Sequence, residues 1–465
     1  MSRRYLIGLA VLILWLAPVV YADDVSLPVH ERVELANGAV LILSEKHDVP
    51  LIGLEAVVRG GAVTDPDGLN GLAGLLAGVM QKGAGSRDAA AFAEAIEVVG
   101  GELSASAGLE GINISADFMS RDGELMVELV TDLLRQPTLA SDEVIKLRDR
   151  SINLITAAKG SNPGNLLPGY GNAFLFGDHP YGNPINGSET TLANVTHDDL
   201  LRYYDDHVGG DRLIISVVGD FNIEAMKTRL TRAFGDWRAA AVPLPTFIAA
   251  AKNIGRRVLL IDKPGATQTY FWIGNVGVAV DYPRRADLNL ANTVFGGRFT
   301  SMLNTELRVK SGLTYGARSL LRRPSKPGAA VISSFTATST TVEAIDMALA
   351  VLAKLRDSGI DDDMILSARN YIMGQFPPRL ETASQIAAQF AWLERYGLGT
   401  AYIDEYGAEL AAATRNSIAA VIDQVYPRAE DLTFVLIGDA SLIREDVSQY
   451  GTVTEMSIDE PRFRP

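Results

Sequence analysis

The stretch Arg212-Leu-Ile-Ile-Ser-Val-Val-Gly-Asp220 decides the fold of this 465-residue chain, because a similar stretch ends the chain's second half. Its β-branched and aliphatic residues predict a buried strand that a glycine closes. Before it, Thr196-His-Asp-Asp199 predicts a helix start, with Thr196 as N-cap and Asp199 completing a capping box. The same order recurs near the C-terminus, where Thr414 precedes a helical run and the strand Leu432-Thr-Phe-Val-Leu-Ile-Gly-Asp439.

The two copies also have nearly the same spacing. Thr196 and Gly219 are 23 residues apart (219 − 196), and Thr414 and Gly438 are 24 apart (438 − 414). The two glycines are 219 residues apart (438 − 219), close to half of the chain. This repetition predicts two similar halves.

The openings of the two halves match as well. Residues 39–44 and 52–58 are predicted strands in the first half, and residues 257–262 and 268–276 in the second, from their β-branched and aromatic content. Helices follow in both. The first helix carries Phe92, Ile96 and Val99 at helical spacing, with Ser86 as its expected cap and Gly100 after it. The second carries Leu288, Ala291 and Phe295.

Strands mixed with long helices in each half predict an α+β fold class, with two homologous domains in one chain. We expect an N-terminal domain over residues 23–240, a linker over 241–251 and a C-terminal domain over 252–465. The linker prediction rests on Pro243-Leu-Pro245 and the alanine-rich residues that follow it.

Residues 1–22 have the pattern of a signal peptide. Arg3 and Arg4 form a basic start, Tyr5 to Val20 is almost wholly apolar, and Val20-Tyr21-Ala22 supplies a cleavage site. We therefore expect cleavage after Ala22 and export, with a periplasm as the destination and membrane contact only through this segment before cleavage. An uncleaved anchor is the alternative. Because the apolar run is shorter than the roughly 20 residues of a membrane span, cleavage is favoured.

Composition excludes several classes of protein. The formal charge of −14 argues against a nucleic-acid partner, which requires basic surface to displace counterions from phosphates. The chain has no cysteine, so disulfides, thiolate zinc sites and thiol catalysis are excluded.

The segment Gly71-Leu-Ala-Gly-Leu-Leu-Ala-Gly-Val-Met-Gln-Lys-Gly83 resembles the zinc motif of the pitrilysin/insulinase family of metallopeptidases, the inverzincins. Active members carry H-x-x-E-H there, in which both histidines bind zinc and the glutamate activates water. The resemblance extends over nearly the whole chain after the signal segment. It implies that each half folds as an inverzincin-peptidase-like domain.

The chemical positions of that motif are replaced. Gly74 and Gly78 stand at the histidine positions and Ala77 at the glutamate position, while the third ligand is expected near Leu154 to Thr156, where there is no carboxylate. None of the five histidines forms an i, i+4 pair with another. We therefore expect no catalytic residue and no metal in this half. The two glycines are explained either by close packing or a partner's approach, or by drift after loss of function.

The second half keeps a different part of the family pattern. Asn304-Thr-Glu-Leu-Arg-Val-Lys-Ser-Gly-Leu-Thr-Tyr-Gly316 resembles the family's C-terminal motif, in which an arginine and a tyrosine hold the substrate backbone near the scissile bond. Here these residues are Arg308 and Tyr315. A guanidinium and a phenol can donate to a peptide carbonyl and stabilise developing oxyanion charge. From the residues alone, an exposed arginine at a helix end and a tyrosine at a strand start remain the alternative.

The resemblance therefore implies a non-catalytic subunit of a heteromeric periplasmic zinc metallopeptidase. Such a chain binds no cofactor itself and pairs with a zinc-bearing homologue, to which it contributes Arg308 and Tyr315 for an unfolded peptide substrate. The alternative is a catalytically inert scaffold or a peptide-binding protein of the periplasm. Alone, the chain is expected to be inactive.

Overall fold

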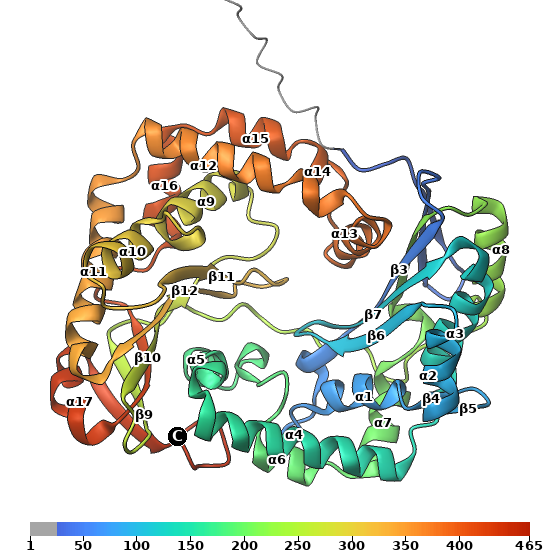
Figure 1. The fold of residues 1–465 in the computed structure, drawn as a ribbon, viewed down its shortest axis with the longest axis horizontal. Helices are drawn as coiled ribbons and strands as arrows, with labels where there is room; N and C mark the ends of the chain where they lie inside the picture. The colour runs from blue at the N-terminus through green and yellow to red at the C-terminus, as the bar shows by residue number, and fades with distance from the viewer. Residues whose placement is uncertain (1–25) are drawn as a thin grey trace, which may run out of the picture.

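The computed structural model describes residues 26–465, so the expected signal segment and its cleavage site lie outside the described residues. Within that range the chain forms two halves that lie side by side, each built on a six-stranded sheet with helices packed against it (Figure 1). No helix among residues 26–465 is both long and apolar enough to cross a membrane. The predicted α+β organisation with two homologous halves is confirmed.

The strands group into one sheet for each half and one short hairpin. The first sheet contains β1 (Glu31–Glu34), β2 (Val40–Glu45), β3 (Leu51–Arg59), β6 (Glu102–Ala107), β7 (Gly111–Met119) and β8 (Leu213–Gly219). The second contains β9 (Arg257–Asp262), β10 (Gln268–Val276), β11 (Arg318–Leu321), β12 (Ala329–Ala337), β13 (Thr433–Gly438) and β14 (Thr452–Ser457). The hairpin consists of β4 (Gly83–Ala84) and β5 (Arg87–Asp88).

The helices are distributed over both halves. The first half has α1 (Leu72–Met80), α2 (Ala89–Glu97), α3 (Gly123–Arg135), α4 (Ser141–Ser161), α5 (Leu167–Phe176), α6 (Glu189–Asn194), α7 (His197–His207) and α8 (Ile223–Phe234). The second half has α9 (Arg285–Asn292), α10 (Met302–Asn304), α11 (Thr341–Ser358), α12 (Asp362–Gln375), α13 (Ala383–Arg395), α14 (Ala401–Asp404), α15 (Tyr406–Ala412), α16 (Arg415–Val425) and α17 (Ala440–Val447). Two π-helical turns, η6 (Thr293–Gly297) and η7 (Thr305–Lys310), follow α9 and α10.

The two sheets share one topology. Their strand orders are β1-β2-β8-β3-β7-β6 and β14-β9-β13-β10-β12-β11. In each, the strand that ends in the repeated glycine lies parallel to the first predicted strand and antiparallel to the second. The sheets differ at one edge, where β1 is antiparallel to β2 but β14 is parallel to β9. The four opening strands predicted from the sequence are confirmed to within one residue at each end.

The repeated helix starts are confirmed, and one cap is wrong. Thr196 and Asp199 form a reciprocal capping box, and Thr414 forms the equivalent box with Ser417. The expected cap Ser86 lies instead in the β4–β5 turn. Asp88 caps α2, where its carboxylate accepts from the Ala91 N–H at 2.9 Å. Because the short hairpin occupies residues 83–88, the helix begins later than a cap at Ser86 would place it.

A helix from each half packs on the sheet of the other half. α13 covers the face of the first sheet that is turned toward the second half, at β3 and β8, and α5 lies against β10 and β13 of the second (Figure 1). The α13 contact buries Ala383, Ile386, Ala387, Phe390 and Ala391 against Val40, Ile42, Val57, Ile214 and Val218. At α5, a Cβ on Gly171 would lie 2.8 Å from the Trp272 ring, so glycine permits the close approach. Because each half contributes a helix to the sheet of the other, the two halves are held in a fixed relative position.

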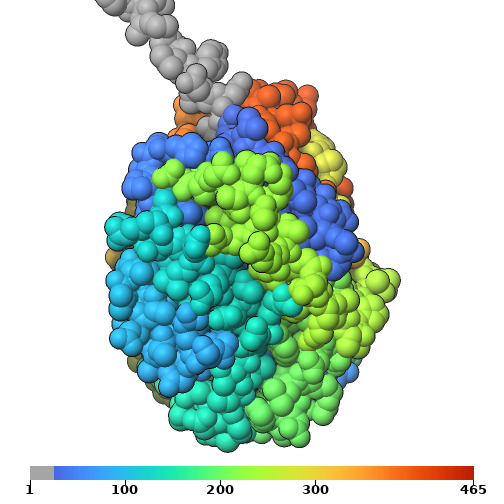
Figure 2. Space-filling view, turned by 90° about the vertical axis from the view of Figure 1, so that its right-hand side faces the viewer, coloured from blue at the N-terminus to red at the C-terminus, as the bar shows by residue number. Residues whose placement is uncertain are grey.

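Residues 241–251 connect the halves without a helix or strand. The carbonyl of Ile248 lies 2.9 Å from Nε2 of His179, and Phe247 packs against the first half's core. Figure 2 shows the outer face of the first half, where the lime-coloured residues that follow β8 lie across the blue N-terminal residues. The connection therefore follows the surface of the first half rather than standing free.

Two carboxyl groups lie in the contact between α13 and the first sheet. Glu55 accepts from the Ser115 hydroxyl at 2.5 Å, and Asp117 accepts from the hydroxyl of Ser384 on α13. Burial raises the pKa of Glu55 to about 7 and also raises that of Asp117. Burial in this contact therefore makes the ionised form of both groups less favourable.

Glu55 should make the stability of the fold depend on pH. Its folded pKa of about 7 exceeds the ordinary value of 4.5, so the folded chain holds the proton more tightly and loses stability as pH rises through this window. Glu55→Gln removes that loss, and we expect it to raise the free energy of unfolding by roughly 1–3 kcal/mol at pH 8 but little at pH 4.5. Urea unfolding at both pH values measures this, with exposed Glu430→Gln as control. An equal effect of Glu55→Gln at the two pH values contradicts it.

Candidate functional site

The segment that resembles the zinc motif forms α1, and a buried carboxylate caps it. Asp65 accepts from the backbone N–H groups of Gly71 at 2.7 Å and Ala73 at 2.9 Å. Burial raises the pKa of Asp65 to about 7, while these backbone N–H groups oppose the shift. Gly71 has φ 96°, and a Cβ there would lie 2.7 Å from Gly187. Sequence reasoning missed Asp65 because it lies outside the motif and caps the helix from six residues away.

The positions at which active family members carry zinc ligands have no side chain here that could bind a metal ion. Ala77 is fully buried, and a Cβ on Gly78 would lie 2.4 Å from Cδ2 of Leu147 on α4. A Cβ on Gly74 would meet only the Ile185 carbonyl oxygen, at 3.5 Å. A leucine methyl group from α4 therefore fills the space beside Gly78, whereas space remains beside Gly74.

The expected third-ligand region on α4 does not supply a carboxylate either. Leu154 is exposed, Ile155 is buried, and the hydroxyl of Thr156 donates to Glu189 at 2.7 Å. Glu189 is also paired with the buried ammonium of Lys159. Among residues 26–465, no three His, Asp or Glu side chains are grouped so that they could hold a metal ion. The residues present do not fit a zinc ion.

The space beside Gly74 leads to a prediction on stability. Glycine inside a helix costs roughly 0.5–1 kcal/mol relative to alanine, and no atom lies closer to the added Cβ than 3.5 Å. Gly74→Ala should therefore stabilise the isolated chain by about 0.5–1 kcal/mol, measured by urea unfolding. Gly78→Ala is the matched comparison, and its gain should be smaller because Leu147 must move. Destabilisation by Gly74→Ala would show that the helix needs glycine within this chain. If Gly74→Ala stabilises the isolated chain but weakens its association with a partner chain, the close approach of that partner explains why glycine is present.

The structure brings Arg308 and Tyr315 together, and it adds Phe299. The guanidinium carbon of Arg308 lies 4.4 Å from the centre of the Tyr315 ring and 4.7 Å from that of the Phe299 ring. Both rings are well exposed, at 74% for Tyr315 and 61% for Phe299. Within residues 26–465, the Arg308 side chain forms no hydrogen bond or ion pair. Its hydrogen-bond donors are therefore free, while the aromatic faces restrict its position.

The backbone that carries Tyr315 is anchored below it. The N–H groups of Leu313 and Thr314 both donate to the Leu307 carbonyl, at 2.9 and 3.2 Å. The buried hydroxyl of Thr314 accepts from Ser334 on β12 at 3.1 Å. Tyr315 thus projects from a fixed turn. Arg308 itself lies in the π-helical turn η7, a local geometry that is frequent at functional sites.

Phe299 was not found from the sequence as part of this site. It lies nine residues before Arg308, in the segment Phe295-Gly-Gly-Arg-Phe-Thr300, to which the sequence analysis assigned no function. The amide of Asn304 donates to the Phe299 carbonyl at 2.7 Å and so fixes the backbone beside the ring. An exposed phenylalanine in a loop was the available signal, because it has no packing reason to be there.

The Arg308 site and the degenerate motif lie in different parts of the molecule. In Figure 1, α10 and the turn that follows it lie on the left, in the second half, whereas α1 lies at the lower right. The turn that carries Arg308 and the α1 helix therefore lie on different sides of the molecule (Figure 1).

A third motif connects the two halves. Tyr181, from the segment His179-Pro-Tyr-Gly182, donates to the Glu110 carboxylate at 2.6 Å and accepts from the Lys326 N–H at 2.9 Å. Glu110 also accepts from the backbone N–H of Ser325. This network joins the β6–β7 connection of the first half to the β11–β12 connection of the second. The segment therefore has a structural role in joining the two halves.

Comparison with known proteins gives two family matches. Residues 40–189 match the family model described as insulinase (peptidase family M16), and residues 194–372 match the model described as peptidase M16 inactive domain. An uncharacterized zinc protease of Bacillus subtilis is 23% identical over 411 residues, which cover 88% of this chain and 98% of that protein. An uncharacterized zinc protease of Mycobacterium leprae is 27% identical over 331 residues, covering 70% and 72%.

Two solved structures are similar in fold. A peptidase M16 inactive domain from Pseudomonas fluorescens has a TM-score of 0.81 at 20% identity, over 88% of this chain and 97% of that one. A protease from Helicobacter pylori has a TM-score of 0.81 at 20% identity, over 89% and 100%. At this identity the two structures support the fold alone.

Proposed function

Because this chain belongs to the insulinase family of peptidases, peptidase family M16, we propose that it is the non-catalytic subunit of a two-chain zinc peptidase. Its partner in this proposal is a homologous chain that carries H-x-x-E-H and the zinc ion. This chain contributes Arg308 and Tyr315, which bind the peptide substrate. The observation that carries the proposal is the half-buried Arg308 guanidinium, which contacts two exposed rings and forms no side-chain hydrogen bond or ion pair within residues 26–465.

The chemistry of the pair suits a peptide carbonyl. A guanidinium stays charged at any physiological pH and presents several N–H donors in one plane. Its guanidinium carbon lies 4.7 Å from the centre of the Phe299 ring and 4.4 Å from that of the Tyr315 ring, so both rings restrict its position. A substrate carbonyl placed beside the pair would accept from Arg308 and from the Tyr315 phenol. Both interactions strengthen as negative charge develops on the oxygen, which stabilises the transition state.

The placement of the pair supports action on a partner's zinc site. The first half of this chain has no side-chain donor at the motif positions, and η7 lies away from α1 (Figure 1). A site that holds substrate but lies far from any possible zinc position in its own chain needs the zinc from elsewhere. Four domains, two from each chain, then enclose the space in which an unfolded peptide is cleaved.

The proposed compartment is the periplasm of a two-membrane bacterium. The basic start, the apolar run and the Val20-Tyr21-Ala22 site support export. Because the chain has no cysteine, it can form no disulfide in an oxidising compartment, and its stability there must come from its hydrophobic core.

The proposal is tested with the chain from residue 23 on, purified alone and then mixed with a zinc-bearing homologue from the same organism. Alone, it should contain less than stoichiometric zinc and cleave no unfolded peptide. The mixture should cleave peptide faster than the homologue alone, and a chelator should abolish the activity. Stoichiometric zinc and cleavage by the isolated chain would contradict the proposal, as would a mixture no faster than the homologue.

A further inference from the structure

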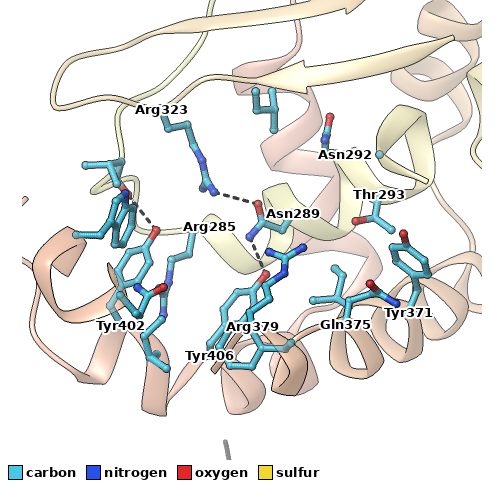
Figure 3. A pocket seen from close by; sticks show the side chains of 18 residues that line it. Arg285, Asn289, Asn292, Thr293, Arg323, Tyr371, Gln375, Arg379, Tyr402 and Tyr406 are labelled. Carbon is cyan, nitrogen blue, oxygen red and sulfur yellow. Dashed lines mark hydrogen bonds between the residues drawn. The ribbon is translucent and has the colours of Figure 1, made fainter. Parts of the chain in front are cut away.

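A cavity of about 550 Å³ opens in the second half, and the function proposed above gives it no role. Its walls come from α9, from the residues that follow β11, and from α12 through α15 (Figure 3). Three arginines, Arg285, Arg323 and Arg379, line it, and no aspartate or glutamate does. In a chain with a formal charge of −14, such a concentration of positive charge requires an explanation.

The charge of Arg285 is neutralised by a neighbouring carboxylate. Its guanidinium forms a two-fold hydrogen bond with the Glu409 carboxylate at 2.8 and 2.9 Å. Its guanidinium carbon also lies 3.4 Å from the centre of the Tyr402 ring. Arg285 therefore forms part of the wall and contributes little uncompensated charge.

The other two arginines are not neutralised. Nη2 of Arg323 donates to the Asn289 side-chain oxygen at 3.2 Å, while Nη1 is buried and has no hydrogen-bond partner. Arg379 is exposed, and its side chain forms no hydrogen bond or ion pair within residues 26–465. Figure 3 shows Arg323 reaching in from the segment after β11, with Arg379 below it in the view. A buried donor without a partner is costly, so an acceptor in the cavity would lower the free energy.

The remaining polar groups also favour an acceptor. The Asn289 amide donates to the Tyr406 hydroxyl at 2.6 Å, which leaves the hydroxyl hydrogen free to donate (Figure 3). Aromatic side chains supply much of the rest of the wall, among them Tyr371, Phe376 and Trp392. The cavity thus combines cationic donors with an apolar surface, which suits an anionic group attached to a hydrophobic one.

The edge of the second sheet connects this cavity to the Arg308 site. β11 is the last strand of that sheet and pairs only with β12, so its other edge is unpaired. Tyr315 precedes β11 by three residues, and Arg323 follows it by two. An extended peptide that adds to this edge would therefore run from the Arg308 site to the cavity.

We propose that this cavity binds a carboxylate of an unfolded peptide through Arg323 and Arg379, and that its aromatic wall holds the neighbouring apolar side chain. The carboxylate is the C-terminus of the peptide or the side chain of an aspartate or glutamate. A planar pair of oxygens matches the hydrogen-bonding geometry of guanidinium groups. The path along β11 rests on the function proposed above, whereas the carboxylate site does not.

Calorimetric titration of the isolated chain with three N-acetylated hexapeptides tests the proposal. The first ends in phenylalanine with a free carboxylate as its only charge, the second is its amide, and the third is the amide with one glutamate before the phenylalanine. We expect the free acid to bind about tenfold or more tightly than its amide. Tighter binding of the glutamate peptide than of the plain amide assigns the site to side chains as well. Equal affinity of all three peptides, no binding of any of them, or binding of inorganic phosphate alone would overturn the proposal.

Variants locate the binding. Arg379→Met changes an exposed residue and should not affect folding. It is expected to weaken the binding of the free-acid peptide about tenfold, so that its affinity becomes close to that of the amide. Arg323→Met should weaken it similarly, with circular dichroism checking the fold. Arg415→Met, an exposed arginine on α16, is the matched control and should change nothing. Unchanged affinity in Arg379→Met contradicts the assignment. The carboxylate preference is measured on the isolated chain without a partner, so its outcome is separable from that of the two-chain proposal.

Discussion

Arg308→Ala is expected to lower kcat/KM of the reconstituted two-chain peptidase by about 10²-fold or more, with association of the two chains unchanged. The side chain forms no hydrogen bond or ion pair within residues 26–465, so its loss leaves no partner unsatisfied there and should not destabilise the fold. What is lost is a charged donor aimed at the oxygen on which charge develops. The effect should therefore appear in turnover rather than in assembly.

Related variants divide the effect among the three side chains. Arg308→Lys keeps the charge but loses the planar donors, so it should recover only part of the activity. Tyr315→Phe removes one donor and keeps the ring, and Phe299→Ala leaves the guanidinium less restricted. Each of these variants should lower kcat/KM by less than Arg308→Ala does. Exposed Arg415→Ala is the control.

Steady-state peptide cleavage, together with gel filtration of the mixture, measures the effect. If Arg308→Ala and Tyr315→Phe both cleave peptide at the unmodified rate, the pair has no role in substrate binding. If Arg308→Ala instead prevents the two chains from associating, the residue belongs to the interface and not to the substrate site.

Gly53→Ala is expected to destabilise the chain by roughly 1–3 kcal/mol, because it removes the space into which α13 docks. A Cβ on Gly53 would lie 2.5 Å from the backbone nitrogen of Ser384 and 2.6 Å from its Cα. These are backbone atoms at the start of α13, so no side-chain rotation can relieve the overlap. The helix must move away from β3, and its buried contact through Phe390 is weakened.

Gly374→Ala is the matched control for this change. Gly374 lies in α12, and no atom lies within 4 Å of an added Cβ, so alanine should be neutral or slightly stabilising there. Urea unfolding gives the stability, and limited proteolysis at the residues before α13 reports its release. Should Gly53→Ala prove as stable as the control, with α13 equally protected, the two halves are not held together by this contact.

The parts of the fold that depend on local sequence could be predicted. The capping box at Thr196, the helix start at Thr414 and the four opening strands are set by neighbouring residues, and they were found in place. The predicted cap of α2, Ser86, was wrong because this residue lies in the β4–β5 hairpin that precedes the helix. The crossing of α5 and α13 to opposite sheets could not be predicted. α13 is amphipathic and α5 is apolar over most of its length, and nothing local specifies which sheet either helix covers.

The candidate site shows the same division. Arg308 and Tyr315 were predicted by resemblance, and the structure places them in contact. Phe299 was missed, because its contact with the guanidinium is a tertiary relation. The cavity was missed for a similar reason. Arg323 and Arg379 are 56 residues apart in the sequence (379 − 323), and neither belongs to a recognisable motif.

The measurement that tests the central claim most directly is a pull-down of the tagged chain from its native compartment, with analysis of co-purifying protein, zinc and peptide cleavage. We predict a second, homologous chain that carries H-x-x-E-H in roughly equal amount, with zinc and with activity that a chelator abolishes. A lone chain without zinc or activity would contradict the two-chain peptidase. It would indicate instead an inert scaffold or a peptide-binding protein.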